Sequence, residues 1–421
     1  MKTGFYTLHT SARIYVLLFS LYWAQGLPVG FMTQALPVIL RAEGLSLSQI
    51  GGFGLLMLPW SIKVFWAPLV DRYGIAQVGH YRSWILATQL LSVLLLIALS
   101  FMPIAALNQP QYLLLFFVGL LLMNTTGATQ DIATDGLAVN ILKSSQIGWG
   151  NTLQVMGSRL GFIVGGGAML WALDWLQWQA TFLCLAGLVF FNTLAIAVYQ
   201  ESEHPKTKQP VQEQHFLKRT QAYLAHFIQT REGLAWLWVL LTFKIADGLA
   251  GPITKPLLVD VGLSYSQIGV YITMFGAGAA LLGAVLAGYS LQHLDRAKAL
   301  FSFSILKMMS LLGFVALAWA YQYGETLAPI WIYSINAFED FVSAMLLVVM
   351  LSLIMEYSRK TTAGTDFTLQ VALMATVSGG LYMLSGMLGD VLGYTAYLTI
   401  ICLIAGLCLL PILYWRKIKK P

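Results

Sequence analysis

Three ionisable side chains lie inside two apolar stretches that follow one another in the chain. Asp131 and Asp135 are four residues apart, so a helix would place both carboxylates on one face. Arg159 lies about twelve residues into the next apolar stretch, a depth at which it needs a carboxylate partner. Inside a membrane each such group costs roughly 2.5–3.5 kcal/mol and usually pairs or faces a cavity. Carboxylates and a base in this setting could relay protons.

We expect Asp131 to load and release the proton, with Arg159 as its partner. Arg159 has two further interpretations, because it could anchor an anionic group of a substrate or form a structural ion pair with Asp135. Elsewhere, Lys244 and Asp247 are three residues apart and can neutralise each other on one helix. The remaining candidates for lining a polar cavity are Gln25, Gln34, Glu339 and Asp340.

The composition excludes an ordinary soluble domain. Of 421 residues, 58% are hydrophobic and 10% charged, against about 25% charged in soluble domains. The mean hydropathy is +0.73. The formal net charge of +6 comes from basic residues dispersed at the ends of apolar segments or inside them, which argues against a nucleic-acid partner. The three cysteines lie in apolar runs without metal-ligand spacing, so we expect neither a disulfide framework nor a metal or cofactor.

The apolar segments predict an all-α polytopic membrane protein. A hydrocarbon core about 30 Å thick needs about 20 apolar residues per helix. Cuts at charges, prolines and polar clusters predict spans at 14–40, 47–70, 84–107, 112–142, 147–172, 179–199, 233–259, 264–292, 298–321, 327–357, 366–391 and 394–415.

The distribution of lysine and arginine predicts the orientation of these spans. If both termini are cytoplasmic, eighteen of the 24 basic residues lie on the cytoplasmic side and Arg41 alone lies outside. The other five lie within spans: Lys63, Arg159, Lys244, Lys255 and Lys307. The polar stretch 200–232 is then a cytoplasmic linker between six-helix bundles at 1–199 and 233–421.

The two bundles repeat each other in sequence. Residues 44–51 return as residues 262–269 with seven of eight identical, and Thr152–Val155 returns as Thr368–Val371. Paired membrane repeats that run in the same direction are typical of the major facilitator transporters, whose substrate site lies between the halves. At this offset Arg159 corresponds to Ala375, so its charge is not part of the repeated scaffold.

A charged loop follows the second predicted span. Its sequence Asp71-Arg72-Tyr73-Gly74, with Arg82 beyond it, resembles a cytoplasmic loop motif of major facilitator proteins. In that motif an acid, a glycine and basic residues lock the halves in the outward-facing state. The resemblance implies a gating loop made of Asp71, Arg72, Gly74 and Arg82. Glycines and prolines also interrupt the first and seventh spans, which predicts a substrate path, or alternatively close helix packing.

Longer stretches resemble one branch of this superfamily. Residues 66–73 and 82–89, and residues 128–136 followed by 158–161, are similar to AmpG-type muropeptide permeases. The Gln-Asp-Ile-x-x-Asp signature at 130–135 is distinctive of the AmpG and acetyl-CoA transporter branch. Within it, the twelve spans and residues 26–31, 35–37 and Gly136 look more like the RhtX/FptX siderophore permeases. Those proteins import iron-loaded siderophores across the inner membrane as single polypeptides.

The resemblance implies a bacterial inner-membrane secondary transporter that works by alternating access. We expect it to import a siderophore with proton coupling, as a monomer, with a muropeptide permease as the alternative. A membrane-embedded enzyme is the remoter alternative, since all six histidines lie outside the spans. A transporter-like receptor would need a soluble signalling domain, for which the linker is too short. No P-loop is present, so ATP does not drive the chain directly.

Overall fold

The computed structural model confirms an all-helical membrane fold. It describes residues 2–36, 39–40, 53–102, 107, 109–201, 225, 227–263, 267–325 and 327–419. Within these residues, nine helices are long and apolar enough to cross a membrane. The described residues form two compact units, of which the first comprises Met1–Lys206 with Met355–Thr368 and the second Thr207–Ile354 with Leu369–Pro421.

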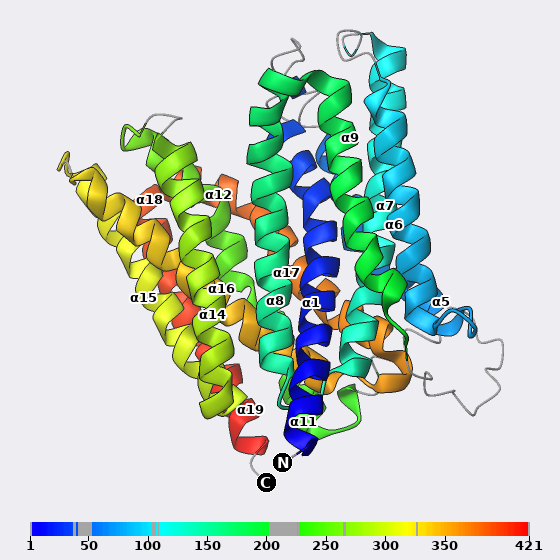
Figure 1. Cartoon of the computed structure of the whole chain (residues 1–421). Helices are drawn as coiled ribbons and strands as arrows, with labels where there is room; N and C mark the ends of the chain where they lie inside the picture. The colour runs from blue at the N-terminus through cyan, green and yellow to red at the C-terminus, as the bar shows by residue number, and fades with distance from the viewer. Residues whose placement is uncertain are drawn as a thin grey trace. The chain divides into compact units, whose positions relative to one another are not determined.

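The first unit is built from the N-terminal helices and a short piece of chain from much later in the sequence. Figure 1 shows its long helices lying roughly alongside one another. Its elements are α1 (Lys2–Gly30), η1 (Phe31–Ala35), η2 (Phe53–Met57), α4 (Leu58–Ile62), η3 (Lys63–Phe65), α5 (Ala67–Arg72), α6 (His80–Ser100), α7 (Pro110–Ile141), α8 (Ile147–Phe162), η5 (Ile163–Ala168), α9 (Met169–Val198) and η7 (Lys360–Thr362).

The second unit holds most of the later helices, with its own apolar core around Leu257, Phe314 and Ile401. Two of its helices, α16 and α17, continue into the first unit at residues 355–368. The elements are α11 (Arg231–Phe243), α12 (Ile245–Asp260), η6 (Ile268–Met274), α14 (Phe275–His293), α15 (Arg296–Gln322), α16 (Pro329–Tyr357), α17 (Ala363–Leu392), α18 (Tyr394–Leu407) and α19 (Leu409–Ile418).

The observed helices follow the predicted spans closely. The nine candidate membrane helices coincide with nine of the twelve predicted spans. The other three, at 47–70, 147–172 and 366–391, are helical over most of the residues that the structure describes. The fifth and sixth spans are separated at Gln177, whose φ of 59° and ψ of 177° break an otherwise continuous helix. The predicted linker residues 202–224 lie outside the described part of the chain.

The second predicted span is not one continuous helix. Over its described residues it begins with the 3₁₀ helix η2 and continues as the five-residue α4 and the six-residue α5, with a short 3₁₀ turn, η3, between the last two. Pro59 and Pro68 lie in the first turns of α4 and α5. Proline has no N–H to continue a preceding helix but fits the first turn of a new one. The break places Lys63 on η3, where it is buried.

Glycines let α1 approach α8 very closely, and Figure 1 shows the two helices side by side. A Cβ atom on Gly26 would lie 2.6 Å from the Ser158 carbonyl oxygen, and one on Gly161 would lie 2.6 Å from the Gly26 Cα. A Cβ on Gly157 would lie 2.9 Å from the Phe19 carbonyl oxygen. Small residues permit such approach between membrane helices. Gly26 of the first span therefore permits close packing against α8, and the substrate path along this helix stays a prediction.

Candidate functional site

The first unit contains a buried ion pair between Lys63 on η3 and Asp131 on α7. Their side chains are only 5% and 13% exposed. The Lys63 ammonium lies 5.3 Å from the centre of the Trp60 ring, within cation–π range. The Trp60 indole N–H donates to Asn124 on α7 at 2.9 Å. The Trp66 indole N–H donates to the Thr129 hydroxyl of α7 at 3.1 Å, so the broken second span is fastened to α7 on both sides of Lys63.

Asp135, one helical turn further along α7, has different surroundings. It is buried, and its Oδ1 accepts hydrogen bonds from the Tyr22 hydroxyl at 2.8 Å and the Gln154 amide at 3.2 Å. These donors are neutral, whereas the partner of Asp131 is a cation. The adjacent Thr134 hydroxyl accepts from the Gln25 amide at 3.4 Å. The two carboxylates share a helix but differ in the charge that faces them.

The expected pairing of Arg159 with an α7 carboxylate is wrong. Arg159 is half-buried on α8, and among the described residues it has no hydrogen bond or ion pair with Asp131 or Asp135. On the same helix it is Gln154 that faces Asp135. Five residues along a helix with 3.6 residues per turn rotate a side chain by about 140°, so Arg159 points to another face. Lys63 occupies the position that the sequence assigned to Arg159.

A small cavity inside the first unit is bounded by α1, α6, α7 and α9. Its polar lining residues are Gln25, Ser92, Asn124 and Gln130. The Gln130 side-chain amide nitrogen is buried and has no hydrogen-bond partner among the described residues. The assignment of Gln25 to a substrate path stays a prediction, and the side chain of Gln34 lies outside the described part of the chain.

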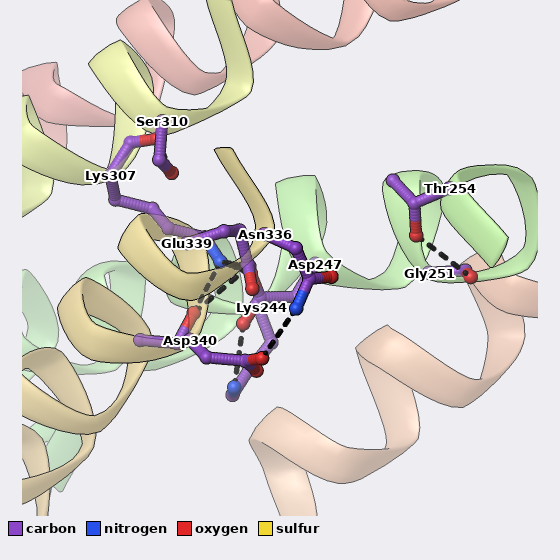
Figure 2. A network of polar contacts seen from close by, with 10 residues as sticks. Lys244, Asp247, Gly251, Thr254, Lys307, Ser310, Asn336, Glu339 and Asp340 are labelled. Carbon is purple, nitrogen blue, oxygen red and sulfur yellow. Dashed lines mark hydrogen bonds and ion pairs between the residues drawn. The ribbon is translucent and has the colours of Figure 1, made fainter. Parts of the chain in front are cut away.

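The second unit contains a chain of four alternating charges drawn from three helices (Figure 2). Lys244 at the break between α11 and α12 bonds to Asp247 at 2.6 Å, which confirms the predicted neutralisation. Lys307 on α15 bonds to the other oxygen of Asp247 at 3.0 Å. It also pairs with Glu339 on α16, and the Ser343 hydroxyl lies 2.5 Å from its ammonium. Lys307 is therefore the centre of this cluster.

Asp340, the neighbour of Glu339, belongs to a separate contact. Its Oδ2 accepts a hydrogen bond from Asn336 at 2.9 Å, and Asn336 also donates to the Ile272 carbonyl on η6 at 3.2 Å. The Asp340 carboxylate packs directly against Gly276 of α14. Glu339 thus pairs with Lys307 on α15, while Asp340 bonds to Asn336 and packs against α14.

Asp71 of the predicted gating loop caps the start of α17 inside the first unit. Its carboxylate accepts from the backbone N–H of Gly364 at 3.0 Å and of Thr365 at 2.7 Å, two groups in the first turn of that helix. The first N–H groups of a helix lack partners in the helix itself, and a carboxylate there is favourable. The Tyr81 hydroxyl also donates to Asp71 at 2.6 Å. Burial raises the pKa of the Asp71 carboxyl, although the hydrogen bonds from Thr365, Tyr81 and Gly364 oppose that rise.

The rest of the predicted gating loop makes other contacts. Arg82 donates to the carbonyl oxygens of Ile196 at 3.1 Å and Ala197 at 2.6 Å, at the C-terminal end of α9. Arg72 is exposed, with its guanidinium 5.1 Å from the Tyr73 ring. Gly74 lies where a Cβ would come within 2.9 Å of the His80 Cα. Among the described residues of this loop, Asp71 is therefore the one that bonds to α17.

Three residues of these sites were not selected from the sequence. The sequence shows Lys63 and Lys307 as bases inside predicted spans, and this location was the signal available for a functional role. Their partners depend on which helix faces which, and the break in the second span decides it for Lys63. Tyr81 gave no signal, because a tyrosine near the start of a membrane helix is ordinary.

Comparison with known proteins gives related chains and one clear structural class. The family profile described as "Acetyl-coenzyme A transporter 1" matches residues 13–174, well under half of the chain. The Anhydromuropeptide permease of Escherichia coli is 28% identical over 89% of this chain and 74% of its own. The Putative transporter AmpG 4 of Rickettsia conorii is 23% identical over 94% of this chain and 95% of its own.

Among solved structures, the major facilitator transporter FucP in the outward conformation superimposes with a TM-score of 0.67. The alignment covers 97% of this chain and 99% of FucP at 17% sequence identity. The chain has the major facilitator fold. The two relatives named above are called a permease and a transporter, and this chain is similar to each over most of its length. The predicted similarity to siderophore permeases is not shown, and the named relatives favour the muropeptide alternative.

Proposed function

We propose that this chain is a secondary transporter that imports an anhydromuropeptide, a sugar linked to a peptide, across the bacterial inner membrane. The observation that supports this most is the similarity to the Anhydromuropeptide permease over 89% of the chain. The muropeptide alternative thereby replaces the siderophore as the favoured substrate. Both termini lie in the cytoplasm, the transporter works by alternating access, and it acts as a monomer.

Proton coupling is assigned to Asp131. Its partner Lys63 is buried, so protonation of Asp131 leaves a cation without its counter-charge at membrane depth. Removing one partner of a buried ion pair is strongly unfavourable, whereas the intact pair is tolerated. Protonation therefore forces Lys63 or its helix turn to rearrange, and this is the property that a coupling site needs. Asp135 keeps its neutral donors Tyr22 and Gln154 and acts as a fixed structural acid.

Gating is assigned to Asp71 and the start of α17. The three hydrogen bonds to the Asp71 carboxylate hold the first turn of α17 in the first unit. Most of α17 lies in the second unit, beginning at Leu369. A contact of this kind can hold the start of α17 in place during alternating access. Arg82 instead stabilises the C-terminal end of α9 through its bonds to the Ile196 and Ala197 carbonyl oxygens.

Uptake by whole cells tests the substrate. Cells with and without the gene are given radiolabelled anhydromuropeptide or a radiolabelled iron-loaded siderophore in parallel. We expect gene-dependent uptake of the anhydromuropeptide alone. Gene-dependent uptake of the siderophore alone would restore the siderophore assignment and remove the proposed one. The gating role of Asp71 is tested in the same assay: an Asp71→Ala variant should take up the same substrate more slowly than the wild type.

A further inference from the structure

The charge cluster of the second unit is unequal at its two ends. Lys307 has three partners, Asp247, Glu339 and Ser343, and its side chain is 10% exposed. Lys244 bonds to Asp247 alone among the described residues, apart from a ring contact to Phe243, and its side chain is 31% exposed. The lysine at the accessible end of the chain is therefore the loosely held one.

Exchange of partners has a low cost at Lys244 and a high cost at Lys307. If Lys244 leaves Asp247, that carboxylate keeps its bond to Lys307 at 3.0 Å and no internal charge is stranded. If Lys307 leaves, Asp247 keeps Lys244 but Glu339 loses its cation. An uncompensated buried charge is strongly destabilising, whereas replacing one carboxylate by another on the same ammonium is nearly balanced. Lys244 is thus the cation that can accept a different anion.

The backbone at Lys244 suits such an exchange. The helix that would form the seventh span ends at Phe243 and restarts at Ile245, so Lys244 lies at the break between α11 and α12. Its φ of −98° and ψ of 6° depart from helical values. Figure 2 shows Lys244 and Asp247 together on this segment, with Lys307 and Glu339 reaching it from other helices. Interrupted helices of this kind supply ligand groups in transporters because the break frees them from the regular packing.

We propose that Lys244 binds a free carboxylate of the transported substrate, and that Asp247 occupies the same ammonium when the substrate is absent. The inference rests on the proposed function, because a peptide-bearing substrate has a terminal carboxylate. The ligand class is a carboxylate, since the Lys244 ammonium now bonds a carboxylate oxygen of Asp247. Asp247, held by Lys307, then acts as a competitor that the substrate displaces.

A matched pair of ligands tests this assignment on the purified full chain in detergent. One ligand is an anhydromuropeptide with its peptide carboxylates free, and the other is the same molecule with those groups amidated. We expect the wild type to bind the free acid at least about tenfold more tightly, a difference worth about 1.4 kcal/mol. Lys244→Met should abolish this preference by weakening the free acid alone, and Lys244→Arg should retain it.

Two further variants separate a binding role from a structural one. Asp247→Asn removes the competing charge, so the free acid should bind several-fold more tightly while the amide is unchanged. Lys298→Met, at an exposed lysine in the first turn of α15, should leave both affinities as they are. Equal binding of both ligands by the wild type overturns the carboxylate assignment and leaves the proposed substrate in place. Binding of neither ligand overturns both, and equal weakening of both by Lys244→Met reduces Lys244 to a structural residue.

Discussion

At the level of single residues, the two carboxylates of α7 differ in the side chains that bond to them. Asp131 faces the Lys63 ammonium, while Asp135 accepts from the Tyr22 hydroxyl and the Gln154 amide. A charged neighbour makes the state of Asp131 matter to the surrounding structure, because adding a proton unbalances a buried pair. Neutral donors impose no such condition on Asp135. On this difference rests our proposal that Asp131 couples transport to protons while Asp135 has a fixed structural role.

The interdependence of Lys63 and Asp131 can be measured directly. Lys63→Met should destabilise the purified chain by about 3–5 kcal/mol, because it strands the Asp131 carboxylate in a buried position. The double variant Lys63→Met/Asp131→Asn should be less destabilised than the sum of the single variants, since it leaves no unpaired charge. Free energies of unfolding in mixed micelles measure the cycle, with Lys143→Met at an exposed lysine as control. Additive effects would show that the pair is not coupled.

At the level of elements, the start of α17 is packed between two parts of the first unit. Gly364 lies where a Cβ atom would be 3.0 Å from the Asp71 Oδ1 and 3.0 Å from both the Ile132 Cγ2 and its carbonyl oxygen. The Ile132 backbone lies within α7 and cannot move cheaply. The first turn of α17 is therefore in close contact both with Asp71 and with α7, the helix that carries Asp131.

This packing predicts the effect of a single methyl group. Gly364→Ala should weaken the contact between Asp71 and α17 and slow transport severalfold, because the added Cβ needs space that Asp71 and Ile132 occupy. Gly380→Ala lies on the same helix with nothing within 4 Å of its Cβ, and it should leave transport unchanged. Initial rates of uptake at matched expression compare the two variants. Equal rates for both would mean that the start of α17 is not held as tightly as its geometry indicates.

The contact at Asp71 should also depend on pH. In the closed contact, in which Asp71 bonds to the first turn of α17, burial raises the pKa of the Asp71 carboxyl. In water the pKa of an aspartate is about 3.9. A group that binds its proton more tightly in one state favours that state at low pH. The closed contact should thus gain stability as the pH falls through the range between the two pKa values, and lose it as the pH rises.

Spin labels at Gln77 and Thr361, two exposed positions of the first unit, can follow this contact by their separation. We expect the short-distance population to grow as the pH is lowered from 7 toward about 4. Asp71→Asn removes the titrating group, so its distance distribution should not change with pH. A population that shifts in the opposite direction would reverse the assigned sign.

At the level of the whole molecule, the excess of basic residues predicts which loops face the cytoplasm. In a background with the three native cysteines replaced, a cysteine at Glu325 should be labelled by an impermeant maleimide in intact cells. A cysteine at Gln77 should be labelled only after the membrane is permeabilised. Both positions are exposed, so access rather than burial decides the outcome. Labelling of Gln77 in intact cells would invert the topology.

Much of this architecture is predictable from the apolar segments and the placement of charges. A membrane helix must form its backbone hydrogen bonds internally, so each span appears in the sequence as a long apolar segment. The pairing of Lys244 with Asp247 follows for the same reason, since residues three apart on one helix are neighbours. The pairing of Lys63 with Asp131 does not follow, because it depends on a helix break at Pro59 and Pro68 and on the packing of separate helices. Contacts between distant helices are set by tertiary structure.

We propose that this chain couples the uptake of an anhydromuropeptide to protons through Asp131. Proteoliposomes with an imposed acid-outside pH gradient test it, with accumulation of labelled substrate and counterflow at equal pH as the two readouts. The wild type should concentrate the substrate only when the gradient is present. Asp131→Asn mimics the protonated acid and should lose accumulation while it keeps counterflow, and Asp135→Asn should lower both together. Accumulation by Asp131→Asn in response to the gradient would contradict the account and move the coupling role to Asp247 or Glu339.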